Sequence, residues 1–209
     1  MLHRMIGCVL LLAVGVCAAA TPKDQFDMQF GGRIKAARQT GTKSDDVDLG
    51  RELFQAACVE ENNDQLTYQV AACYELCAKT PDGFDIAIDA MLILAEVLEG
   101  HRVLALDNAL VVQKKQYSLT KSTERSLLIP RYLQLLDRLV DATLAAGSMG
   151  DAIDHARRAI TIAKAAKSDR LNYFQTRYDE VQAREAASRK AAILEKKVLA
   201  EPLNAEARR

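Results

Sequence analysis

The chain has 209 residues, enough for one domain of ordinary size. Aromatic residues make up only 5%, there is no Trp, and acidic and basic residues are equal in number, so the formal net charge is zero. Ala and Leu are abundant and no segment alternates like a strand, which predicts helices. The balanced charge argues against a protein that binds nucleic acid, which would show a basic face.

The first twenty residues have the three parts of a secretory signal: a short basic start, an apolar run, and the small residues Ala18-Ala19-Ala20. We therefore predict that residues 1–20 are a signal peptide cleaved after Ala20, and that the protein is exported to the periplasm or the cell exterior. This segment would be the chain's only contact with a membrane. The apolar run is shorter than the ~20 residues of a spanning helix. A retained anchor and lipid attachment at Cys17 are the weaker alternatives.

Residues 21–43 contain Pro, Asp and a Gly pair, and they are predicted to be a linker that includes one short helix. Helical periodicity predicts a helical-repeat domain over residues 44–200, and a tail over 201–209. Caps and turn residues divide that domain into helices at 45–60, 64–79, 84–98, 103–117, 123–146, 150–167 and 169–200. Pro130 lies inside the fifth of these, so we expect a kink or a break just before it.

Small residues recur at fixed places in "LAAGSMGDAIDHARRAITIAKAA", residues 144–166. Small side chains let two helix backbones approach to the short end of the usual ~8–10 Å separation. A Gly in the turn tolerates a positive φ. The expected packing residues are Leu136, Leu139, Gly147, Ala152, Ala156 and Ala159.

The fifth and sixth predicted helices resemble a tetratricopeptide (TPR) repeat, whose family builds antiparallel helix pairs of about 34 residues. The chain departs from the family pattern at Val140, where a smaller residue is usual, and at Lys164, where a Pro is usual. The helices at 64–79 and 84–98 resemble a weaker second copy. The chain is also similar to a group of exported bacterial TPR-like proteins without assigned activity. These resemblances imply an all-α fold, a short solenoid of stacked antiparallel helix pairs with a long C-terminal helix; an ordinary helical bundle is the alternative.

The sequence contains no catalytic motif. We therefore expect a non-catalytic scaffold that binds a protein partner, without cofactor, metal or nucleic acid. The repeat alignment indicates Arg138, Asp141, His155 and Arg158 as residues of the partner-binding groove, with His155 at the surface. The alternative is an envelope structural or oligomer-forming protein in which Leu194 and Val198 of the last helix contact a second copy. An enzyme with an unrecognised site is the third interpretation.

Three cysteines follow the signal segment: Cys58, Cys73 and Cys77. Cys73 and Cys77 lie four residues apart on the apolar side of one helix, and such a pair alone is a weak metal signal. Packing as small apolar residues is the first interpretation. A disulfide from Cys58 to Cys73 or Cys77 is the alternative, because export favours oxidation and neighbouring antiparallel helices would bring the thiols together.

Overall fold

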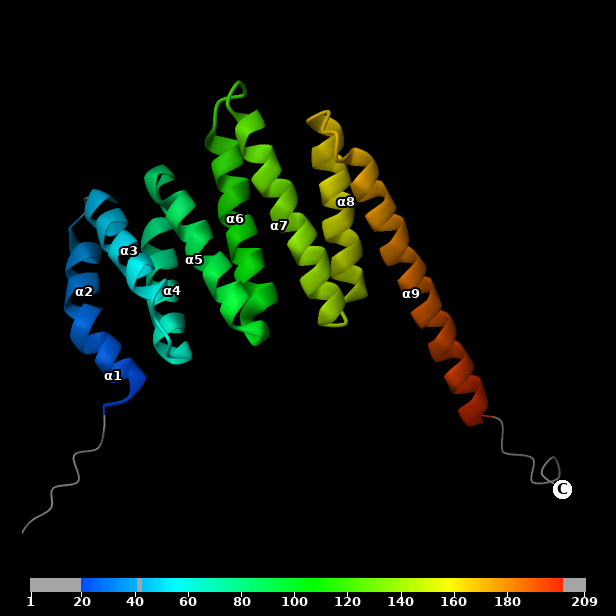
Figure 1. Cartoon of the computed structure of the whole chain (residues 1–209), viewed down its shortest axis with the longest axis horizontal. Helices are drawn as coiled ribbons and strands as arrows, with labels where there is room; N and C mark the ends of the chain where they lie inside the picture. The colour runs from blue at the N-terminus through cyan, green and yellow to red at the C-terminus, as the bar shows by residue number, and fades with distance from the viewer. Residues whose placement is uncertain (1–19, 41–42, 201–209) are drawn as a thin grey trace, which may run out of the picture.

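The computed structural model describes residues 20–40 and 43–200, and all regular structure in these ranges is helical. Helices α1 and α2 follow one another end to end, and from there to α9 consecutive helices run up and down, antiparallel to their neighbours, side by side in an arched row (Figure 1). The predicted all-α stack of antiparallel helices with a long C-terminal helix is confirmed. The predicted signal peptide, and the tail over 201–209, lie outside the described residues.

Three antiparallel pairs form the body of the row. The helices are α1 (Pro22–Phe26), α2 (Gly32–Gln39), α3 (Lys43–Ala57), α4 (Asn63–Cys77), α5 (Phe84–Val97), α6 (Arg102–Leu119), α7 (Arg125–Ala145), α8 (Met149–Ala165) and α9 (Leu171–Ala200). The most extensive interfaces join α3 to α4, α5 to α6 and α7 to α8. The weaker second repeat expected from the sequence falls on α4 and α5, which therefore belong to two different pairs.

The short helix expected within residues 21–43 is α2, but the residues before it, which we expected to be a linker, are helical as well. The Thr21 hydroxyl accepts a hydrogen bond from the Asp24 amide at 3.2 Å, and the Asp24 carboxylate accepts one from the Thr21 amide at 3.1 Å. This capping box, with Pro22 at the first helical position, starts α1. A π-helical turn, Asp27–Gly31, joins α1 to α2. The residues "TPKD" were a helix-start signal that the sequence interpretation missed.

The N-terminal helices cover one end of the core. Phe26, Phe30 and Ile34 are spaced by four residues and all are buried. The Phe26 ring lies 5.8 Å from that of Tyr68 on α4. The Gln65 side-chain amide, also on α4, donates a hydrogen bond of 2.6 Å to the Pro22 carbonyl. These contacts make α1 and α2 part of the folded domain.

The turn between α7 and α8 is built around Gly147, whose φ is +78°. The Gly147 amide donates to the Leu144 carbonyl at 3.1 Å, and the Ser148 amide donates to the Thr143 carbonyl at 2.8 Å, which is a Schellman motif. Leu136, Leu139, Ala152, Ala156 and Ala159 are fully buried around the interface that follows. Helix α7 passes through Pro130 as one helix, so the expected break does not occur. Pro130 lies near the helix start, where only one helical turn precedes it.

The three cysteines are free thiols, and the Cys58 disulfide considered above is not formed. Cys73 and Cys77 are buried in α4, whereas Cys58 is exposed just after α3. Cys77 packs against Gly50, because a Cβ at Gly50 would lie 2.2 Å from the Cys77 sulfur. Cys58 is eight residues beyond Gly50, about 12 Å along the helix axis. The antiparallel pairing therefore separates it from the Cys77 thiol.

Helix α9 packs on the row with its first half only. Phe174 and Val181 are buried, and Val181 joins a small cluster with Val140 and Ile153. All residues from 186 to 197 are exposed, and α9 extends away from the row (Figure 1). Within the described ranges, no helix combines the length and the apolar character needed to cross a membrane.

Candidate interaction face

Charged side chains connect α5 and α7 across one side of the row. Arg131 on α7 forms an ion pair of 2.8 Å with Asp85 on α5 and a second one with Asp89. About two helical turns further along α7, Arg138 forms an ion pair of 3.2 Å with Glu96 of α5. Because these pairs join helices two apart in the chain, α5 and α7 contribute to one face, to which the start of α6 adds Arg102 and Leu106.

Helix α9 joins the same face through Asp137 of α7. The Tyr173 hydroxyl donates to the Asp137 carboxylate at 2.9 Å, and Arg170 lies 3.2 Å from it. Arg177 forms an ion pair with Asp141, while its buried Nε is 3.8 Å from Asp137, longer than a hydrogen bond. We call this surface the α5–α7–α9 face. Alternating charge along three helices gives it the polar character of an interaction surface.

Two hollows on this face meet at Arg138. The first, of about 360 Å³, is lined by Asp89, Leu92, Arg131, Gln134, Leu135 and Arg138. The second, of about 420 Å³, is lined by Ala95, Glu96, Arg102, Leu106, Arg138, Asp141, Ala142 and Ala145. Each has charged groups around an apolar lining, a combination that orients a ligand while burying its apolar part. The Arg138 side chain is 30% exposed and is therefore accessible from both.

The acidic and phenolic groups of the face are partly desolvated. Burial raises the pKa of the Asp89 carboxyl, although the nearby Arg131 acts in the opposite direction. Burial also raises the pKa of Tyr173, and its hydrogen bond to Asp137 adds to that effect. Partial desolvation strengthens the interactions of these groups with an incoming polar segment, because fewer water molecules screen them.

The structure does not bring the four expected groove residues together. Arg138 and Asp141 of α7 lie on the α5–α7–α9 face, but His155 and Arg158 belong to α8. His155 is only 7% exposed, so our expectation of a surface histidine was wrong. Burial lowers its pKa, and of the acidic groups that oppose this shift Asp107 of α6 acts most strongly. The position was misjudged because the tertiary packing that covers the imidazole is invisible in the local helical pattern.

The main partners on the face were missed from the sequence. Asp85 and Asp89 are four residues apart on α5, and Arg131 and Arg138 are seven apart on α7, so each pair lies on one side of its helix. Opposite charges at such spacings on two helices were the available signal. Leu194 is exposed, as expected, whereas the structure does not describe the side chain of Val198.

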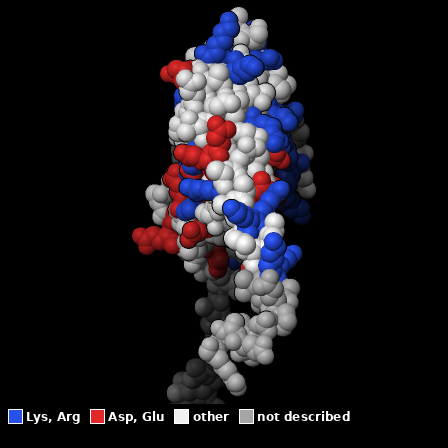
Figure 2. Space-filling model, turned by 90° about the vertical axis from the view of Figure 1, so that its right-hand side faces the viewer, with Lys and Arg blue, Asp and Glu red and all other residues white. Residues whose placement is uncertain are grey.

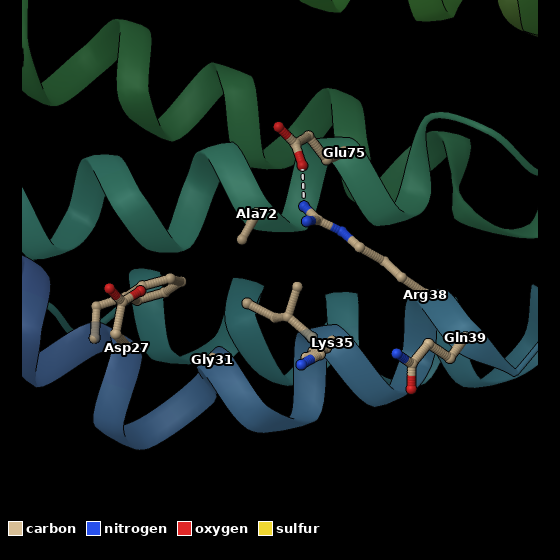
Figure 3. A pocket seen from close by; sticks show the side chains of 9 residues that line it. Asp27, Gly31, Lys35, Arg38, Gln39, Ala72 and Glu75 are labelled. Carbon is tan, nitrogen blue, oxygen red and sulfur yellow. Dashed lines mark hydrogen bonds and ion pairs between the residues drawn. The ribbon is translucent and has the colours of Figure 1, made fainter.

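A third hollow lies at the other end of the row, between α2 and α4 (Figure 3). It measures about 450 Å³ and has an apolar base formed by Phe26, Ile34 and Ala72. Arg38 reaches across it from α2 and forms an ion pair with Glu75 of α4. Because Arg138 lines two adjoining hollows, whereas this hollow stands alone, we consider the α5–α7–α9 face the better candidate.

The other titratable groups with shifted pKa values do not gather at one place. Burial and a hydrogen bond to Cys77 raise the pKa of Cys73, and the same hydrogen bond lowers the pKa of Cys77; both thiols lie within α4. Across residues 20–40 and 43–200, no three His, Cys, Asp or Glu side chains are placed to hold a metal ion.

Comparison of the chain with models of known protein families, with curated proteins and with solved structures gave no match. The geometry of the chain itself is therefore the basis for its functional interpretation.

Proposed function

We propose that this protein is a non-catalytic, exported helical-repeat scaffold that binds a protein partner on its α5–α7–α9 face. The two hollows that meet at Arg138 are the observation that carries the proposal. They combine apolar lining residues with accessible groups of both charge signs, as expected for a surface that receives a polypeptide segment. The stacked antiparallel pairs hold this surface rigid, because every helix packs on its neighbours in the chain.

The resemblance of α7 and α8 to a TPR repeat supports this proposal. The Gly147 turn and the fully buried Ala152, Ala156 and Ala159 are the features of that repeat that keep two helices close. Arg138 and Asp141, which the repeat alignment places in the groove, lie on the α5–α7–α9 face. Export is proposed from the signal-like first twenty residues.

Site-specific photo-crosslinking tests the proposal in cells that produce the protein. A photoreactive amino acid at Gln134, which is exposed in the first hollow, should capture one distinct partner. The same amino acid at Arg157, exposed on α8, should not capture it. Adding Arg138→Glu should remove the Gln134 crosslink, because the substitution reverses the charge shared by both hollows. Equal capture from both positions, or capture that is insensitive to Arg138→Glu, would contradict the proposal.

A further inference from the structure

The zero net charge of the chain conceals a strong separation of charge along the row. From residue 20 to 101, which covers α1 to α5, there are 15 acidic and 7 basic residues. From residue 102 to 200, which covers α6 to α9, there are 11 acidic and 18 basic residues. The two halves therefore carry net charges of −8 and +7. Since α1–α5 and α6–α9 occupy opposite halves of the row (Figure 1), the molecule has an acidic half and a basic half.

The exposed half of α9 concentrates this basic charge. Residues 186–197 include four basic residues and one acidic residue. Lys190, Ile193, Leu194 and Lys197 lie on one side of the helix, because their spacing is i, i+3, i+4 and i+7. Ile193 and Leu194 are 56% and 53% exposed. The α9 end of the row shows basic side chains along one edge, down to the start of the grey segment (Figure 2).

The acidic half offers a surface with the complementary pattern. The loop between α3 and α4 and the first turn of α4 carry Glu60, Glu61 and Asp64, next to Val59, which is 80% exposed. Glu60 is engaged with the Gln69 amide at 3.1 Å, whereas Glu61 and Asp64 are exposed. Val59 beside acidic groups therefore complements the exposed side of α9, where Ile193 and Leu194 lie between two lysines.

We propose that copies of this chain associate head to tail, with the Lys190–Lys197 side of α9 docking on the acidic α3–α4 loop of the next copy. Two different surfaces meet in such an interface, so each bound copy leaves one docking surface free, and assembly continues beyond a dimer. The interface is small and strongly electrostatic, so its affinity depends on salt. This self-association involves surfaces apart from the α5–α7–α9 face and stands independently of the proposed function.

Analytical ultracentrifugation of the full chain tests the association. At low ionic strength the weight-average mass should rise with protein concentration past that of a dimer. At about 0.5 M salt the protein should be monomeric, because the Debye length falls to a few ångströms. A monomer at all concentrations in low salt, or association that salt leaves unchanged, would overturn the proposal.

Charge reversal tests the two surfaces separately. The tail variant Lys190→Glu/Lys197→Glu and the head variant Glu61→Lys/Asp64→Lys should each weaken self-association by about tenfold or more. Arg189→Glu/Lys196→Glu is the matched control, since it makes the same charge change about 100° further round α9 and should have a much smaller effect. A control as damaging as the tail variant would show that only net charge matters, and would refute docking by this side of α9.

Mixing the two variants distinguishes head-to-tail docking from symmetric pairing. The tail variant keeps an intact acidic loop and the head variant keeps an intact basic helix, so a 1:1 mixture retains one native interface per pair. The mixture should associate past a dimer, because the reversed α9 of the tail variant and the reversed loop of the head variant also attract each other, while each variant alone stays monomeric and a closed symmetric pair would stop at the dimer. A mixture that remains monomeric would rule out the head-to-tail arrangement.

Discussion

At the scale of single residues, two positions have a structural environment that the neighbouring sequence does not indicate: one has a strained backbone and the other is a buried polar residue. Lys167 ends α8 with a φ of +52°, a conformation that side chains with a Cβ rarely adopt. The Ser168 amide donates to the Ala163 carbonyl at 2.9 Å, so this end repeats the Schellman motif seen at Gly147. His155 is the second such position, a buried imidazole whose Nδ1 has no hydrogen-bond partner among the described residues.

Replacing Lys167 with Gly should stabilise the protein. Glycine adopts positive φ without the steric cost of about 1–2 kcal/mol that a Cβ brings. Part of this gain is offset, because glycine also raises the conformational entropy of the unfolded chain. We expect the free energy of unfolding in urea to rise by about 0.5–1 kcal/mol. Gly147→Ala, the opposite change at the matching position of α7, should lower it by a similar amount. Two changes of the same sign would contradict this account of the helix ends.

Stability should decrease in mild acid because of His155. Its folded-state pKa lies below the ordinary value of 6.5, since burial disfavours the imidazolium. The unfolded chain therefore takes up the proton first, and the stabilising contribution is lost as the pH falls below about 6.5. The charged groups around it are Asp107 of α6 and Asp151, Asp154 and Arg158 of α8.

The measurement compares urea unfolding at pH 7.5 and pH 5 for the wild type, His155→Leu and His101→Gln. The difference between the two pH values should shrink in His155→Leu, while His101→Gln, a change at an exposed histidine, should keep the wild-type difference. An unchanged difference in His155→Leu would mean that other groups control the acid response.

At the scale of helices, close backbone approach determines how α3, α4 and α5 fit together. A Cβ at Gly50 of α3 would lie 2.2 Å from the Cys77 sulfur, and one at Gly83 would lie 2.4 Å from the Cys77 carbonyl oxygen. Cys77 is thus enclosed by two glycines from different parts of the chain. The packing of small residues that the sequence analysis found between α7 and α8 also operates here, with glycine in place of alanine.

A double-mutant cycle at Gly50 and Cys77 should show this coupling. Gly50→Ala alone should cost about 1–3 kcal/mol through overpacking against the sulfur. In a Cys77→Ala background, which lacks that sulfur, the Gly50→Ala substitution should cost much less. Gly100→Ala is the control, because a Cβ there has no neighbour within 4 Å. Additive effects of Gly50→Ala and Cys77→Ala in urea unfolding would show that the two residues do not compete for space.

At the scale of the whole molecule, the row has two unlike ends. The end of the acidic half is covered by α1 and α2, which pack on α4 and α3. The end of the basic half is covered by the first half of α9, and its second half makes no buried contact from 186 to 197. A repeat array needs covered ends to remain soluble. The first half of α9 is enough to cover α8, so residues 186–197 are not needed for this purpose.

Stopping the chain after Glu185 should separate these two roles of α9. The removed residues are exposed, so the free energy of unfolding should change by less than about 0.5 kcal/mol. Self-association in low salt should disappear, because Lys190 and Lys197 are gone. If the shortened protein unfolds, the second half of α9 belongs to the core; if it still associates, α9 is not the docking element.

The sequence by itself determined the elements and their order. Helical periodicity, caps and turn glycines are local features, and they placed the later helices to within a few residues, including the Gly147 turn. The sequence did not reveal α1 or the π-helical turn after it, because Pro22 and the Gly31-Gly32 pair are also typical of linkers. Only the burial of Phe26, Phe30 and Ile34 against α4 decides between the two, and that contact joins residues about forty positions apart.

Tertiary structure alone decided which residues share a surface. Pairing α5 with α6 and α7 with α8 brings α5, α7 and α9 onto one face, where Arg138 lies among acidic residues from helices distant in sequence. The same stacking buries His155, although its local pattern is that of an exposed residue. The helical period indicates which side of a helix a residue occupies. It carries no information about which neighbour covers that side, because that depends on how the helices pack.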